Sequence, residues 1–186
     1  MRPRITQRTV QEFANDVSDQ HYAMAGTVIA TSAANAAALG EACMQISFDN
    51  QVDILDWQDA TSRIEQMLHI KNMLLEWADQ DAQAIAAHHK TQTGRIATPQ
   101  LYEGPAEMAR LSITAIKLLQ DFRPLAFGIF GDNLEMAVSL LRGAAQAALR
   151  LLESNINQEP DSSFANEYRP VFNKLVSQIE QSVVVP

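Results

Sequence analysis

One carboxylate, Asp81, stands out because it falls on an otherwise mostly apolar helical row. The row runs at alternating spacings of three and four residues, which keeps one face of a helix, through Ile64, Met67, Lys71, Leu74, Ala78, Asp81 and Ile85. A carboxylate on a buried face must be paired, hydrogen-bonded or protonated, and such groups often transfer protons. The alternative is that Asp81 pairs with a Lys or Arg of a neighbouring helix and only holds packing. Asp79 lies ~200° around the same helix and is expected to face solvent.

Other common catalytic signatures are missing from the sequence. The histidines are His21, His69, His88 and His89, and neither their spacing nor that of Cys43 matches a zinc site. The sequence also contains no GxSxG and no phosphate-binding GxxxxGK[ST] motif. We therefore expect no metal, and we interpret Cys43 as a small core residue.

Gly26 and Thr27 lie where an alanine-rich helical segment begins. A helix N-terminus with small residues can hold an anion or an amide on its unpaired N–H groups. These two residues are therefore candidate binding residues. The alternative is a helix start that Thr27 or Gly26 simply caps.

A later helical segment carries three more candidates. Asp132 and Glu135 have the spacing of a capping box, which predicts Asp132 as the N-cap. Arg142 and Arg150 lie eight residues apart on the polar face of a helix over about 133–155, where they could attract an anionic ligand. The alternative is a solvated face.

The elements that must position these residues are helices. Apolar residues recur at helical spacing nearly everywhere, and strand-type alternation is scarce. The pattern predicts an all-α bundle of about five or six long helices. Their approximate ranges are 9–17, 27–47, 52–88, 105–121, 133–155 and 163–182. Small side chains in 27–47 predict a central, surrounded helix, and Pro105 is expected in the first turn of its helix.

Composition places the chain among globular proteins. With 186 residues we expect one domain, 1–186. A net charge of −8 argues against a nucleic-acid partner and against attachment to a membrane surface, because both need clustered Lys and Arg. No apolar signal-peptide core follows the N-terminus and no stretch is long enough to span a bilayer, so we expect a cytoplasmic protein.

Three stretches together resemble the cyclodeaminase/cyclohydrolase family, which includes methenyltetrahydrofolate cyclohydrolases and the cyclodeaminase part of formiminotransferase-cyclodeaminase. Residues 13–42, ending in AALG, resemble its opening helix, P-G-G-G-S-V loop and alanine-rich helix. Residues 74–85, LLEWADQDAQAI, resemble its L-V-D-x-D-A-x-A-F motif. Residues 105–119, followed by Gly131, Asp132 and Gly143, resemble its P-L-x-x-A segment and N-x-x-S-D helix.

The resemblance implies a helical homodimer with a reduced folate near the subunit interface and with no separate cofactor. The family's catalytic aspartate, the second Asp of D-x-D, falls on Asp81. Its role would be acid/base catalysis, with Gly26 and Thr27 holding the pterin or the chain that follows it, and Asp132 in support. Arg142 and Arg150 would attract the anionic folate tail. The sequence does not separate cyclohydrolase from cyclodeaminase activity.

A second hypothesis remains open: a non-catalytic, dimeric helical family member that binds another small molecule or a protein. The family's glycine loop is reduced here to Met24, Ala25, Gly26 and Thr27. Side chains therefore stand where backbone would approach a ligand. The family's two asparagines near the end of the fifth helix fall on Arg150 and Ser154.

Overall fold

The computed structural model describes residues 4–19, 24–50, 57–91 and 99–182. Within these ranges the chain is α-helical, with two short 3₁₀ helices and no strand, so the prediction of an all-α bundle is confirmed. The elements in chain order are η1 (Ile5–Gln7), α1 (Val10–Asp19), α2 (Ala25–Asn50), α3 (Trp57–Thr91), α4 (Gln100–Phe122), η2 (Arg123–Leu125), α5 (Phe130–Gln158) and α6 (Ser163–Gln181).

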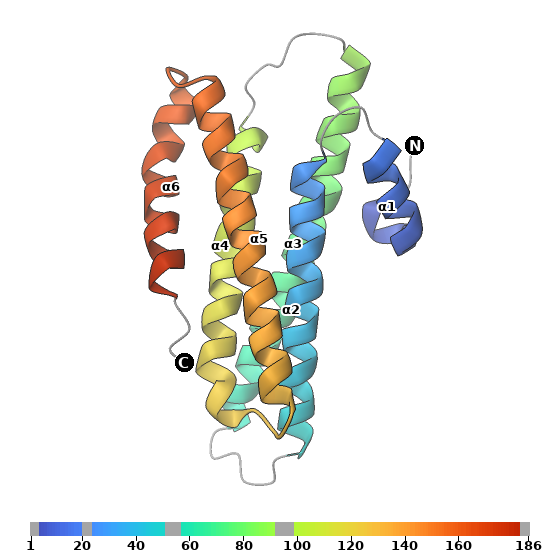
Figure 1. Cartoon of the computed structure of the whole chain (residues 1–186), viewed down its shortest axis with the longest axis vertical. Coiled ribbons are helices and arrows are strands. Elements are labelled where there is room, and N and C mark those ends of the chain that lie inside the picture. The colour runs from blue at the N-terminus through green and yellow to red at the C-terminus, as the bar shows by residue number, and fades with distance from the viewer. Residues whose placement is uncertain (1–3, 20–23, 51–56, 92–98, 183–186) are drawn as a thin grey trace.

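Four long helices, α2 to α5, form the body of the molecule and alternate in direction along its long axis (Figure 1). α2 packs against α3, α4 and α5, and α6 packs against α4 and α5. The 3₁₀ helix η1 contacts α3, and α1 is drawn next to α2 and α3 in Figure 1. No described helix combines the length and the apolar character that crossing a membrane requires.

The prediction that the alanine-rich helix is central is confirmed. Its alanines at 30, 33, 34, 36 and 37 are at most 2% exposed. Alanine favours the helix intrinsically, and its small side chain lets neighbouring helices come close. At Gly40 the approach is closer still, because an added Cβ would lie 2.8 Å from a methyl carbon of Leu119 on α4.

Pro105 does not lie in a first turn, because α4 begins earlier than predicted, at Gln100. The N–H groups of Tyr102 and Glu103 both donate to the carbonyl of Pro99, at 3.0 and 2.9 Å, and start the helix there. Pro105 has no N–H to give to the Leu101 carbonyl four residues back. The side chain of Asn155 on α5 donates to that carbonyl instead. A cross-helix hydrogen bond thus replaces the missing helical one.

Candidate active site

The carboxylate of Asp81 rests against the first turn of α2. Thr27 Oγ1 donates a hydrogen bond of 2.6 Å to Asp81 Oδ2, and the Thr27 backbone N–H also binds the carboxylate. The first N–H groups of a helix have no partner within it, so an anion is well placed there. Residues that lie 54 positions apart are therefore joined at one site.

Gly26 makes this approach possible. A Cβ built at Gly26 would lie 2.3 Å from Asp81 Oδ1 and 2.6 Å from Cγ. No side chain fits in that space without moving the carboxylate, which explains why a glycine precedes Thr27. Both residues are buried.

Burial raises the pKa of the Asp81 carboxyl above its usual value, and the two hydrogen bonds from Thr27 lower it by less. Asp81 as a whole residue is only partly buried, so it keeps some contact with solvent. In the described part of the chain, no Lys or Arg forms an ion pair with Asp81. Among the described residues the alternative of a packing ion pair thus finds no support, and burial is the main influence on the pKa of the Asp81 carboxyl.

The beginning of α4 borders the same stretch of α3. Trp77, one helical turn before Asp81, packs on Gly104, where an added Cβ would lie 3.6 Å from the indole ring. Met24, just before α2, is only 8% exposed. Asp81 therefore lies near one end of the bundle, where α2 begins and α4 packs on α3.

The prediction that Asp79 faces solvent is wrong. Asp79 is 9% exposed and accepts two hydrogen bonds from Thr6. Thr6 Oγ1 lies 2.9 Å from Oδ2, and the Thr6 backbone N lies 3.3 Å from Oδ1. The short helix η1 covers this face of α3. Periodicity within α3 cannot reveal a cover that comes from a segment 73 residues away.

The N-cap prediction for Asp132 is also wrong. α5 begins at Phe130 with Ile129 as its N-cap, so Asp132 lies within the first turn and is exposed. Gly128, at φ 52°, turns the chain early, and the N–H of Gly131 donates to the Gly128 carbonyl. Glu135 does not complete a capping box. Its carboxylate pairs with Arg123, at 3.0 Å.

Asp132 lies at the far end of the bundle from Gly26. The backbone N–H of Phe127 donates to Ser47 Oγ, so the start of α5 meets the end of α2. From Ser47 to Gly26, α2 rises by about 30 Å. The structure therefore does not bring Asp132 to Asp81.

Arg142 and Arg150 lie on α5, which packs on α2, α4 and α6. Arg142 is half-buried, while the side chain of Arg150 is 85% exposed and lies 3.8 Å from Glu153. Of the candidate site residues, the structure joins Asp81, Gly26 and Thr27. The two arginines are in no described contact with them. The described residues also include no group of three or more His, Cys, Asp or Glu that could hold a metal ion.

Comparison with known proteins identifies the family and the fold of the chain. The model of the formiminotransferase-cyclodeaminase family matches residues 9–174. Among solved structures, formiminotetrahydrofolate cyclodeaminase from Thermotoga maritima has the same fold, with a TM-score of 0.70 and 18% identity, over 96% of this chain and 93% of that chain. A search of curated proteins finds no match. Since the family model covers most of the sequence, including Asp81, Gly26 and Thr27, the chain belongs to the formiminotransferase-cyclodeaminase family.

Proposed function

We propose that this chain acts on the one-carbon unit carried by a reduced folate, with Asp81 as the acid/base. The reaction is either the cyclohydrolysis of methenyltetrahydrofolate or the cyclodeamination of formiminotetrahydrofolate. The observation that carries the proposal is the Asp81 carboxyl, held in a partly dry position against Gly26 and Thr27. Family membership supports the substrate class, and the Thermotoga maritima protein of similar fold is a formiminotetrahydrofolate cyclodeaminase.

The chemistry suits a carboxyl group with a raised pKa. In cyclohydrolysis, water adds to the cationic methenyl carbon while Asp81 accepts a proton from it. Asp81 then returns this proton to the N5 nitrogen as the carbon–N5 bond breaks, and the second proton of the water leaves to solvent, which gives the neutral formyl group on N10. In cyclodeamination, N10 attacks the formimino carbon, and Asp81 carries the N10 proton to the departing ammonia. A carboxylate beside the cationic centre also stabilises it by charge. Burial raises the pKa of Asp81, which brings its proton affinity closer to that required near neutral pH.

The test is direct. Purified protein is mixed with methenyltetrahydrofolate, and the loss of its absorbance is followed against a blank. A parallel assay follows the appearance of methenyltetrahydrofolate from the formimino substrate. We expect one assay to show turnover, and Asp81→Asn to reduce it by at least about a hundredfold, as is typical for loss of a general acid/base. Asp49→Asn, an exposed carboxylate on α2, is the matched control. Turnover equal to the blank in both assays would end the enzymatic proposal.

A second candidate is a non-catalytic module that binds another small molecule or a protein. It is favoured by Met24, whose side chain is buried directly before α2 where the family has a glycine loop. Thermal unfolding with 5-formyltetrahydrofolate separates the two. A ligand at 100 times its Kd stabilises the folded state by about 2.7 kcal/mol. No shift with this folate, together with no turnover, would favour the second candidate.

The proposal includes a homodimer, as the resemblance implies. Ile129, Met136 and Leu140 are 74, 57 and 58% exposed. Their spacings of seven and four keep them on one face, and we assign this face to a second copy of the chain. Light scattering of the purified protein should give the dimer mass, and Leu140→Arg should shift it toward the monomer. Leu68→Arg, at an exposed leucine of α3, is the control and should leave the mass unchanged.

A further inference from the structure

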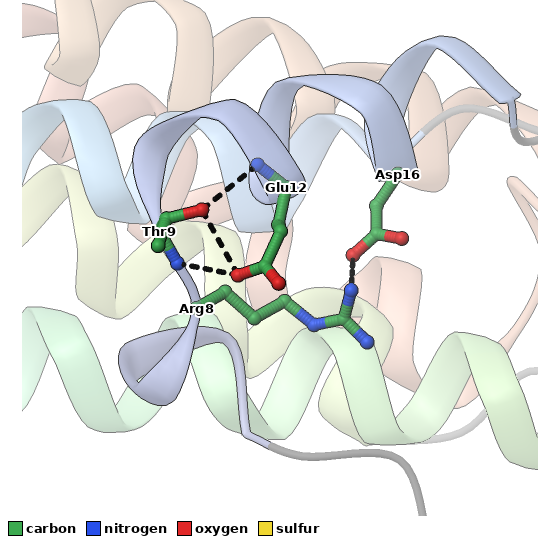
Figure 2. Close-up of polar contacts among 4 residues, drawn as sticks. All are labelled: Arg8, Thr9, Glu12 and Asp16. Atoms are coloured by element: carbon green, nitrogen blue, oxygen red, sulfur yellow. Dashed lines mark hydrogen bonds and ion pairs between the residues drawn. The ribbon is translucent and has the colours of Figure 1, made fainter.

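The polar groups at the start of α1 pair with one another. Thr9 and Glu12 cap this helix reciprocally: the Thr9 N–H donates to Glu12 Oε2 at 2.9 Å, and the Glu12 N–H donates to Thr9 Oγ1 at 3.2 Å (Figure 2). Arg8 forms an ion pair with Asp16 further along the chain. These charges are met within the segment, so we assign them to the folding of α1. Asp81 differs from them, because no Lys or Arg of the described chain pairs with it.

Trp77 is placed to share a ligand with Asp81. It lies four residues before Asp81 on α3. Side chains four residues apart lie on one helix face, with their Cβ atoms ~6 Å apart. A helical side chain also leans toward the turn that precedes it, so the Asp81 side chain leans toward the turn that carries Trp77. The indole and the carboxyl group are therefore neighbours on the surface of α3.

The indole of Trp77 is held along one edge and reaches solvent elsewhere. Its Cε3 and Cζ3 atoms lie on Gly104 of α4, where an added Cβ would be 3.6 Å from each, and the residue is only partly buried. No described residue accepts a hydrogen bond from its N–H. Within the described chain, Arg8 Nε is the only buried side-chain N or O atom without a partner, so the Trp77 N–H is not buried. A fixed aromatic ring thus keeps an accessible part beside Asp81.

Tryptophan at position 77 departs from the sequence motif of the family. In L-V-D-x-D the leucine falls on Trp77 and the valine on Ala78. Ala78 is 0% exposed, whereas Trp77 keeps part of its surface. The motif indicates that a leucine is sufficient for packing at this position. The larger ring therefore adds aromatic surface where the packing of the bundle does not require it.

We propose that Trp77 is a specificity-determining residue of the Asp81 site, whose indole receives the flat, positively charged part of the substrate. This inference rests on the function proposed above. The one-carbon unit of methenyltetrahydrofolate is cationic, and an indole face attracts a cation within about 6 Å. Since the Cβ atoms of Trp77 and Asp81 are ~6 Å apart, one cationic centre can meet both the indole and the carboxylate. Asp81 then moves the proton, and Trp77 selects the ligand.

Tryptophan fluorescence tests this assignment. The sequence contains two tryptophans, so Trp57→Phe leaves Trp77 as the only one. Trp77→Phe is the matched control, because it leaves Trp57 at the first position of α3, about 30 Å away along the helix. Without ligand, acrylamide should quench the fluorescence of Trp77. Addition of 5-formyltetrahydrofolate should change this fluorescence and reduce the quenching, with N-acetyltryptophanamide correcting for light absorbed by the folate. The fluorescence of Trp57 should not respond to the folate.

Kinetics separate a binding role from a structural one. Trp77→Leu, which restores the residue of the motif, should raise KM for methenyltetrahydrofolate about tenfold and leave kcat nearly unchanged. Trp77→Phe keeps an aromatic face and should raise KM less. Trp57→Phe should leave KM as in wild type. Asp81→Asn, in contrast, should lower kcat. If Trp77→Leu is poorly folded by circular dichroism, the fluorescence of Trp57→Phe decides, because Trp77 itself is unchanged there.

The outcomes separate this inference from the proposed function. A folate-dependent change at Trp77 without turnover supports the inference and counts against Asp81 as the acid/base. Turnover without any change at Trp77, and with an unchanged KM in Trp77→Leu, overturns the inference and leaves the proposed function standing. A Trp77 that acrylamide does not quench overturns the inference without any substrate. Neither turnover nor a fluorescence change would overturn both.

Discussion

Gly26→Ala tests whether the Asp81 carboxylate is packed on α2 as described. The new Cβ would lie 2.3, 2.6 and 2.9 Å from Oδ1, Cγ and Oδ2 of Asp81, all below the 3.0 Å that real Cβ contacts respect. The carboxylate must therefore withdraw by roughly 1 Å to reach van der Waals distance. Such a movement breaks the 2.6 Å hydrogen bond from Thr27.

The expected cost follows from these contacts. Overpacking costs about 1–3 kcal/mol, and loss of a hydrogen bond to a charged group costs about 1.5–3 kcal/mol. Replacing glycine by alanine in a helix returns up to about 1 kcal/mol. We therefore expect Gly26→Ala to lower the free energy of unfolding by about 1.5–6 kcal/mol.

Urea unfolding of a double-mutant cycle isolates the contact. In the Asp81→Ala background the carboxylate is absent, so Gly26→Ala should cost nothing there or even stabilise. Gly143→Ala is the matched control, because an added Cβ meets nothing within 4 Å; we expect it to stabilise by up to about 1 kcal/mol. If Gly26→Ala costs the same with and without Asp81, the close contact does not cause the loss and our account of Gly26 fails.

Three further predictions concern the charge and hydrogen bonding of buried groups. Because burial raises the pKa of Asp81, the folded state binds this proton more tightly than the unfolded state. In urea unfolding, the wild type should therefore lose stability relative to Asp81→Asn as pH rises through the folded pKa. A wild type that gains stability relative to Asp81→Asn over this pH range would contradict the prediction. Thr27→Val removes the hydroxyl donor and should raise the pKa of Asp81 further, as followed by a carboxyl-carbon NMR titration; an unchanged pKa would refute the role of the hydroxyl. Asn155→Leu should cost about 1–3 kcal/mol in urea unfolding by leaving the Leu101 carbonyl without its donor. Pro105→Ala restores a backbone N–H and should reduce that cost, whereas equal costs in the two backgrounds would contradict the compensation.

The sequence was sufficient to predict the all-α fold and the position of Asp81 on an apolar helix face. Helical periodicity placed Asp81 on an apolar row, and the structure places its carboxyl in a desolvated position. The same periodicity put Asp79 on the opposite side of α3, which is correct as geometry. The prediction that Asp79 faces solvent was wrong, because the exposure of Asp79 depends on what packs against it, and η1 packs on that side of α3.

Helix starts were harder to predict, since turn geometry decides them. The Asp132 and Glu135 pattern competes with a turn at Gly128, whose positive φ lets the chain enter α5 at Phe130. Glu135 then finds a cation, Arg123, in place of a cap. Likewise Pro105 does not mark the start of α4, because the Pro99 carbonyl accepts the first hydrogen bonds of that helix. The side chain of Asn155 then donates to the Leu101 carbonyl, which Pro105 leaves without a backbone donor. A local motif predicts a cap only when no tertiary partner satisfies the same groups better.

Asp81, Gly26 and Thr27 show what a single sequence cannot give. Each is recognisable alone: an acid on an apolar row, a glycine and a hydroxyl at a helix start. The site that they form depends on contact across 54 positions of the chain, where an O–H and an N–H of Thr27 meet a largely buried carboxylate. The hydrogen bonds favour the charged acid and burial favours the neutral one, and burial prevails. These opposing effects, together with the part of Asp81 that still reaches solvent, are the features on which its proposed acid/base role rests.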